Sequence, residues 1–74
     1  MEMKQTLDAR GLSCPQPVLM AMQAMRTSGS GNIELLVDNE ASRENVARAA
    51  KSQGWDVTVT ELDGNEFSLS LTKS

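Results

Sequence analysis

Residues 32–46, NIELLVDNEASRENV, decide the fold, because the spacing of their apolar side chains changes from that of a strand to that of a helix. The first half alternates apolar residues with others, and its inward positions are Ile33, Leu35 and Val37. This period of two predicts a strand over residues 32–38 with one buried face. Asp38 or Asn39 then serves as the cap of a helix, which is expected from about Glu40 to Gln53.

The predicted helix directs a narrow stripe of small side chains toward the sheet, formed by Val46, Ala49 and Ala50. Small residues on this stripe let the helix lie close to the sheet. Gly54 is expected to end the helix, because glycine readily adopts the left-handed conformation that follows a last helical turn.

Four further elements complete the expected chain order. They are a strand over residues 3–8, a helix that starts at Pro15 and ends at Gly29 or Gly31, a strand over residues 55–60, and a strand through Phe67, Leu69 and Leu71. Asp63-Gly64 between the last two strands predicts a two-residue hairpin turn. The order β-α-β-α-β-β with right-handed crossovers predicts an α/β (α+β) two-layer sandwich, with a mixed four-stranded sheet and two helices on one face.

Length and charge narrow the class of protein. Seventy-four residues make one domain, spanning residues 1–74. The formal net charge of −3 argues against nucleic acid as a direct partner, because phosphate binding needs clustered Lys and Arg. No apolar run approaches the roughly 20 residues of a membrane span, and the N-terminus lacks the features of a signal peptide. A cytoplasmic soluble domain is therefore expected.

Cys14 is the only cysteine, and the chain has no histidine. This composition excludes a Cys-His dyad, a Cys-x-x-Cys redox pair and a zinc site within one chain. A glycine-rich phosphate loop is also missing, so neither a metal nor a cofactor is expected. A single free thiol fits a reducing compartment.

The position of Cys14 favours a reactive thiol. If Pro15 is the first helical residue, Cys14 is the N-cap, and its sulfur faces free N–H groups and the positive end of the helix dipole. Such placement lowers a cysteine pKa from about 8.5 into the range of about 3.5–7.5. Arg10 is a source of further positive charge, while Pro15 and Pro17 donate no hydrogen bond and fix the direction of Cys14. The alternative is a buried cysteine that acts as a small hydrophobe.

Two stretches resemble a known family. Residues 7–18, LDARGLSCPQPV, resemble the signature of the TusA/SirA-like sulfur carriers, in which an Asp and a Gly precede Cys-Pro-x-Pro at a helix start. Residues 37–46 and 52–55 are similar to the N-terminal domain of the YedF-like branch, which is often linked with selenium metabolism. The resemblance covers essentially the whole chain and implies the same β-α-β-α-β-β fold.

The resemblance implies a persulfide relay. Cys14 would accept sulfane sulfur from a cysteine desulfurase or a rhodanese-type donor and pass it to an acceptor protein, for tRNA thiolation, cofactor synthesis, sulfur oxidation or selenium-linked metabolism. Such a protein is a sulfurtransferase-type carrier rather than a multiple-turnover enzyme. The residues expected to shape its loop are Asp8, Arg10, Gly11, Pro15, Gln16 and Pro17. Gln16 replaces the acidic residue that many tRNA-thiolation carriers have between the prolines.

Other interpretations remain open from the sequence. One is a non-catalytic regulatory or interaction module, in which Cys14 is incidental and an exposed sheet edge or face binds a partner. Arg43, Arg48 and Lys51 form either a docking patch for an acidic partner or, as helical spacing to two glutamates favours, a solvated salt-bridged face. Core packing is expected for Met20, Met22, Met25 and Trp55.

Overall fold

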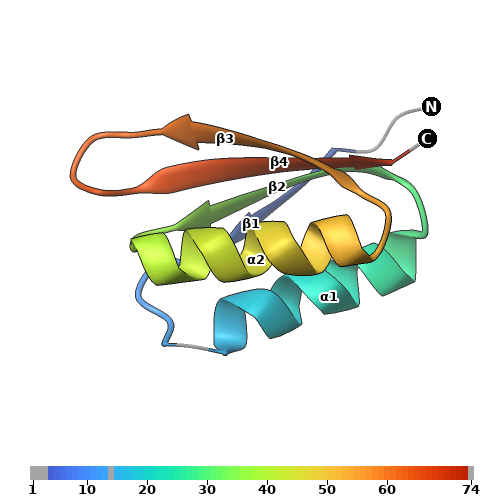
Figure 1. Ribbon diagram of the computed structural model, residues 1–74, viewed down its shortest axis with the longest axis horizontal. Helices are drawn as coiled ribbons and strands as arrows, with labels where there is room; N and C mark the ends of the chain where they lie inside the picture. The colour runs from blue at the N-terminus through green and yellow to red at the C-terminus, as the bar shows by residue number, and fades with distance from the viewer. Residues whose placement is uncertain (1–3, 14, 74) are drawn as a thin grey trace.

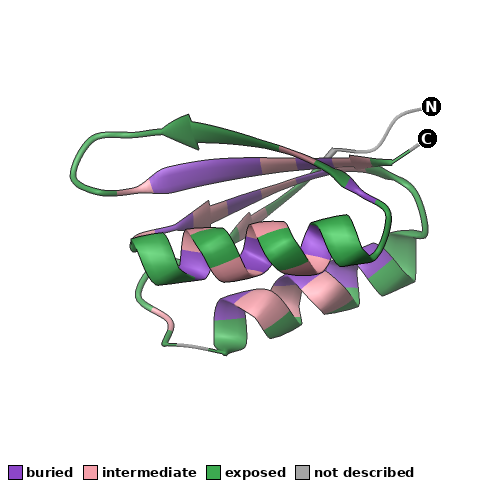
Figure 2. Ribbon diagram, in the orientation of Figure 1, coloured by how far each residue is buried: buried purple, intermediate pink, exposed green. Residues whose placement is uncertain are grey.

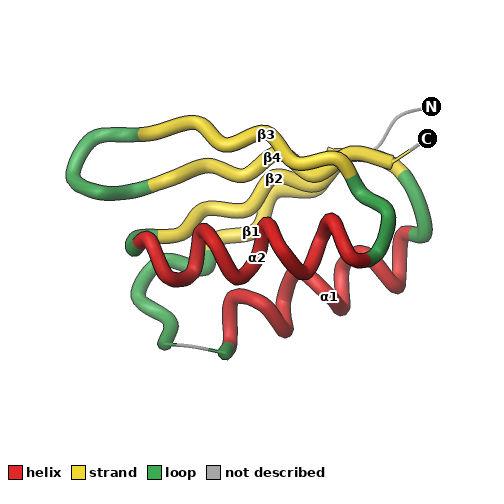
Figure 3. Tube along the Cα trace, viewed as in Figure 1, coloured by secondary structure: helices red, strands yellow, loops and turns green. Residues whose placement is uncertain are grey.

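The computed structural model describes residues 4–13 and 15–73, and its elements follow the predicted order. They are β1 (Lys4–Asp8), α1 (Gln16–Ser28), β2 (Gly31–Val37), α2 (Glu40–Ser52), β3 (Asp56–Glu61) and β4 (Phe67–Lys73). The strands form one mixed sheet in the order β1-β2-β4-β3, in which only the β1–β2 pair is parallel. Both helices lie on the same face of this sheet (Figures 1 and 3), which confirms the predicted two-layer α+β sandwich.

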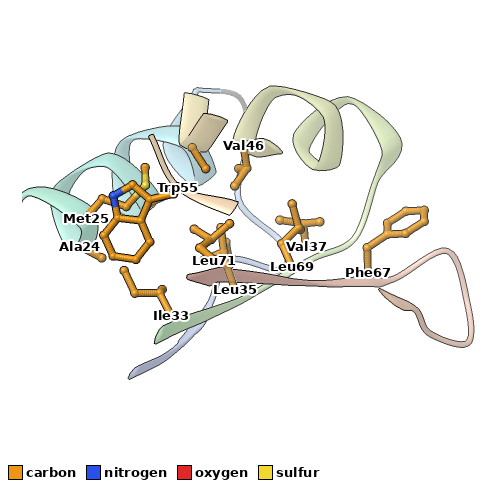
Figure 4. Close-up of a cluster of buried hydrophobic side chains, with 13 residues drawn as sticks. Ala24, Met25, Ile33, Leu35, Val37, Val46, Trp55, Phe67, Leu69 and Leu71 are labelled. Carbon is orange, nitrogen blue, oxygen red and sulfur yellow. The ribbon is translucent and has the colours of Figure 1, made fainter. Parts of the chain in front are cut away.

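The two central strands supply the middle of the core. Ile33, Leu35 and Val37 of β2 are buried, as their alternation predicts. Leu35 lies opposite Leu69 of β4, and both side chains are fully buried beneath the helices (Figure 4). Removing one such side chain from water stabilises the fold by about 1.5–3 kcal/mol. β3 is an exposed edge of the sheet, where only Val57 is half-buried (Figure 2).

Helix α1 packs on the sheet through small residues and methionine. Ala21, Ala24 and Met25 are buried, while Met20 and Met22 are half-buried against the same core. The interpretation of these methionines as packing residues is therefore confirmed.

Helix α2 packs through a stripe that differs from the predicted one. Its buried residues are Ser42, Val46 and Ala50, which follow one another at intervals of four. Ala49 was expected in this stripe but is only half-buried, because it faces α1 across a groove rather than the sheet. The prediction is correct for Val46 and Ala50 and wrong for Ala49.

The ends of α2 agree with the sequence. The side chain of Asn39 accepts a hydrogen bond of 2.7 Å from the backbone N–H of Ser42, so Asn39 rather than Asp38 is the N-cap. Beyond the helix, Gly54 has a φ of 82°, a left-handed conformation that favours glycine. Trp55 is buried and covers one end of the core, as expected.

The β3–β4 turn is longer than the two-residue hairpin that Asp63-Gly64 predicts. The backbone N–H of Leu62 donates to the carbonyl of Glu66 at 2.7 Å, which leaves three residues at the tip. Gly64 and Asn65 have φ values of 72° and 63°. Because asparagine tolerates the left-handed conformation, Asn65 extends the turn by one residue.

Candidate functional site

The loop between β1 and α1 contains Cys14, which lies outside the described residues. Helix α1 begins one residue later than predicted, with Pro15 as the N-cap (φ −101°, ψ 21°) and Gln16 as the first helical residue. The backbone N–H of Gln16 donates to the carbonyl of Ser13 at 2.9 Å, which closes a turn just before the helix. The prediction of Cys14 as the N-cap is therefore wrong, since Cys14 precedes the N-cap by one residue.

This start of α1 offers few hydrogen-bond donors. Pro15 and Pro17 have no N–H group, and the N–H of Gln16 is already bonded to Ser13. Pro17 is buried, whereas Pro15 and Gln16 are exposed. Residues 15–17 therefore fix the backbone at the start of the helix and supply no free N–H group that could bind an anion.

Asp8 and Arg10 form a bidentate ion pair at the start of the loop. Nε and one terminal nitrogen of Arg10 each donate to an oxygen of the Asp8 carboxylate at 2.9 Å, and the backbone N–H of Arg10 donates to the same group at 3.0 Å. The other terminal nitrogen of Arg10 donates to Glu66 at 3.2 Å, which ties the loop to the β3–β4 turn. The positive charge of Arg10, which was expected to act on Cys14, is therefore shared between the carboxylates of Asp8 and Glu66.

These contacts change the ionisation of both partners. The hydrogen bonds from the Arg10 side chain, followed by that from its backbone, lower the pKa of Asp8 from 3.8 to about 2. The same contacts, first with Asp8 and then with Glu66, raise the pKa of Arg10 further above its ordinary value. Asp8 is therefore ionised, and the pair intact, throughout the neutral pH range.

The lowered pKa of Asp8 predicts a specific acid sensitivity. Its contribution to stability is fully present above the unfolded pKa of 3.8 and is lost as the pH falls toward about 2. Between these values, wild-type stability is expected to fall more steeply than that of Asp8→Asn, as measured by urea unfolding at low salt. Asp63→Asn, which removes an exposed hairpin carboxylate, should keep the wild-type slope. Equal slopes for wild type and Asp8→Asn would contradict this account.

Asp38 is a second anchor of the loop. One oxygen of its carboxylate accepts a hydrogen bond of 2.7 Å from the backbone N–H of Gly11, and the other accepts one of 3.1 Å from the side chain of Asn39. Gly11 has a φ of 80°, so a residue with a side chain would be strained at this turn. Asp38 thereby connects the end of β2, the cap of α2 and the loop.

Of the residues predicted to shape the loop, Asp8 and Arg10 contact each other, whereas Gly11 contacts Asp38 and Arg10 also contacts Glu66. The sequence did contain an indication that Asp38 lies at the loop, because Asp38 follows β2 directly. The parallel strands β1 and β2 end at the same edge of the sheet. Figure 1 shows the loop, the start of α2 and the β3–β4 turn at one end of the molecule. Glu66 had no local signal, since it lies 56 residues from Arg10.

A groove between the two helices begins beside this loop. It has a volume of about 460 Å³ and is lined by Pro15, the N-cap of α1, by Val18 of α1, and by Asn45, Arg48, Ala49 and Ser52 of α2. Because Pro15 follows Cys14 in the chain, anything seated in this groove lies next to the loop. The side of the groove formed by α1 is apolar, and that formed by α2 is largely polar.

Within residues 4–13 and 15–73, no three side chains of His, Cys, Asp or Glu are grouped closely enough to hold a metal ion. Nor is either helix in these ranges long and apolar enough to span a membrane.

Fold and site together define a small α+β sandwich whose one cysteine lies in the loop between its first strand and its first helix. A family profile described as "Sulfurtransferase TusA" matches residues 5–73. The chain belongs to the TusA family.

Known relatives agree with this assignment. The sulfur carrier protein TusA of Allochromatium vinosum is 30% identical over 71 residues, which cover 95% of this chain and 93% of that protein. A protein of Methanocaldococcus jannaschii, also named for a sulfur carrier role, is 31% identical over 68 residues, covering 90% and 91% of the two chains. The crystal structure of a SirA-like protein from Desulfitobacterium hafniense superposes with a TM-score of 0.89 at 32% identity, covering 97% of this chain and 99% of that one.

Proposed function

We propose that this protein is a cytoplasmic sulfur carrier that holds sulfane sulfur as a persulfide on Cys14 and relays it to an acceptor protein. The observation that carries the proposal is the Cys-Pro-x-Pro sequence in a loop anchored by Asp8, Arg10 and Asp38, within a chain of the TusA family. A cysteine desulfurase or a rhodanese-type protein is the proposed donor. The hydrogen bonds of Asp8, Arg10 and Asp38 hold the described part of this loop against the sheet edge, where two successive partners can meet it.

The proposed loading step is a thiol exchange at sulfur. The Cys14 thiolate attacks the outer sulfur of a persulfide on the donor, forming a new S–S bond while the donor's S–S bond breaks. The donor cysteine leaves as a thiolate, and Cys14 becomes the persulfide. The transferred sulfur keeps its oxidation state, so the step needs no external oxidant or reductant. Delivery to the acceptor repeats the same exchange with Cys14 as the leaving thiolate.

The residues favour a carrier over an enzyme of rapid turnover. The chain contains no histidine and no second cysteine, so it has neither the usual general base nor a resolving thiol. The described start of α1 also supplies few free amides to stabilise an anion. A single thiol without this additional machinery is suited to accepting sulfur and giving it up again.

Intact-mass spectrometry tests the proposal directly. The protein is incubated with a cysteine desulfurase and free cysteine, and wild type is compared with Cys14→Ser. Wild type is expected to gain the mass of one sulfur atom, removable by a reducing agent, and Cys14→Ser is expected to gain none. The proposal fails if wild type gains no sulfur or if Cys14→Ser gains as much. Ser13→Ala, which leaves the thiol in place, is the matched control.

A further inference from the structure

Charge is unevenly distributed along this acidic chain. Residues 15–31 and 45–55, which contain α1 and most of α2, include three basic residues and no acidic one, although the whole chain has a net charge of −3. The three are Arg26, Arg48 and Lys51, all of them exposed. Every one of the ten Asp and Glu residues lies elsewhere. These two stretches of the helix layer therefore carry only positive charge, and Arg48 lines the groove that begins at Pro15, next to Cys14 in the chain.

These basic side chains are not neutralised by the glutamates of α2. The ion pair in α2 is between Arg43 and Glu44, at 3.8 Å, and the Arg43 guanidinium also lies 5.0 Å from the centre of the Phe67 ring. Within the described part of the chain, Arg48 and Lys51 have no ion-pair partner. The expected salt-bridged face at helical spacing is thus wrong, because Arg43 pairs with the adjacent Glu44 instead, and the alternative of a docking patch gains support for Arg48 and Lys51.

Two hollows lie along α1, one between α1 and α2 and the other between the C-terminal part of α1 and the residues that follow α2, and we call them together the helix seam. The first is the groove of about 460 Å³ lined by Pro15, Val18 and Arg48, among others. The second, of about 150 Å³, lies further along and is lined by Arg26 and Lys73 together with Gln53 and Trp55. Neither hollow is lined by an acidic residue. The helix seam thus combines a largely apolar groove, which starts at the residue that follows Cys14, with basic residues in the lining of both hollows.

We infer that the helix seam is the docking surface for an acidic segment of the sulfur-transfer partner, and this inference rests on the proposed carrier function. The basic residues of the seam attract an acidic segment and orient it as it approaches. Charges at the rim of an interface act mainly by accelerating association. Apolar contact is supplied by Pro15 and Val18, which line the first groove on its α1 side. The partner's reactive sulfur then lies at the Cys14 end of the seam.

The test compares two variants with the same net charge. Arg48→Gln removes one positive charge from the seam, and Thr58→Glu adds one negative charge on the exposed strand β3, so both chains carry −4. With a cysteine desulfurase as sulfur donor at low salt, Arg48→Gln is expected to lower kcat/KM for loading by about fivefold, and Thr58→Glu by less than about twofold. Raising the ionic strength to about 0.5 M should remove most of the difference.

Loading by inorganic polysulfide separates docking from chemistry, because this small donor needs no docking surface. Both variants are expected to load from polysulfide at the wild-type rate. The inference is overturned if the two variants are equally slow with the desulfurase, or if Arg48→Gln is as impaired with polysulfide as with the protein donor. Failure of wild type to load from either source would instead overturn the carrier function itself.

Discussion

Leu35→Ala is expected to leave most of the chain unfolded at room temperature. Leu35 lies on the central strand β2 and is fully buried, opposite Leu69. Truncating such a leucine costs about 2–5 kcal/mol, because the cavity that remains is only partly filled by its neighbours. A domain of this size has only about 3–5 kcal/mol of net stability, so the loss approaches the whole. Far-UV circular dichroism and urea titration would measure it.

Leu36→Ala is the matched control for this prediction. Leu36 is the next residue on the same strand, but its side chain lies on the opposite, open face of the sheet and is only half-buried. The variant should stay folded and unfold at a lower urea concentration than wild type. If both variants were equally stable, the core would not lie between the helices and the sheet as described.

Asp38→Ala is expected to slow loading of Cys14 by a protein donor about tenfold without unfolding the chain. The variant loses the 2.7 Å hydrogen bond from Gly11, so the loop is no longer held to the end of β2. Small errors in the placement of reacting groups are costly in a transfer between two proteins, and a shift of about 1 Å can cost a hundredfold. The variant also loses the 3.1 Å hydrogen bond from the Asn39 side chain, but Asn39 still accepts from the backbone N–H of Ser42 and caps α2, so the helix should persist.

Two comparisons make this prediction specific. Asp38→Asn keeps a side-chain oxygen that can accept the Gly11 N–H, so it is expected to load within about threefold of wild type. Alkylation of Cys14 by iodoacetamide at high pH should be nearly unchanged in both variants, because a small reagent needs no fixed orientation. Asp63→Ala, at the exposed tip of the β3–β4 turn, is the neutral control. A wild-type loading rate in Asp38→Ala would refute the positioning role of Asp38.

The sequence was sufficient for the elements whose signals are local. The alternation of Ile33, Leu35 and Val37 and the capping side chain of Asn39 depend on neighbouring residues, and the structure confirms both. Element boundaries were less certain, since the turn between Ser13 and Gln16 moves the start of α1 by one residue. The left-handed conformation of Asn65 likewise lengthens the β3–β4 turn, which the Asp63-Gly64 pair predicts to be two residues long.

The contacts that anchor the site depend on the tertiary structure. Gly11 and Asp38 are 27 residues apart, and Arg10 and Glu66 are 56 apart, so only the sheet order brings them together. The motif predicts that Asp8 and Arg10 build the loop, but it does not show that a second carboxylate shares the charge of Arg10. Nor does helical spacing show that Arg43 contacts the Phe67 ring while Arg48 has no ion pair in the described structure.

The most direct test of the central claim is to locate the transferred sulfur atom within the chain. Wild-type protein is loaded by a cysteine desulfurase, its persulfide is trapped with an alkylating reagent, and the digested chain is sequenced by tandem mass spectrometry. A persulfide on Cys14 predicts one additional sulfur atom per chain, found in the peptide that contains Cys14 and assigned to that residue. Recovery of this peptide without additional sulfur, from protein whose intact mass had increased, would contradict the assignment of Cys14 as the carrier.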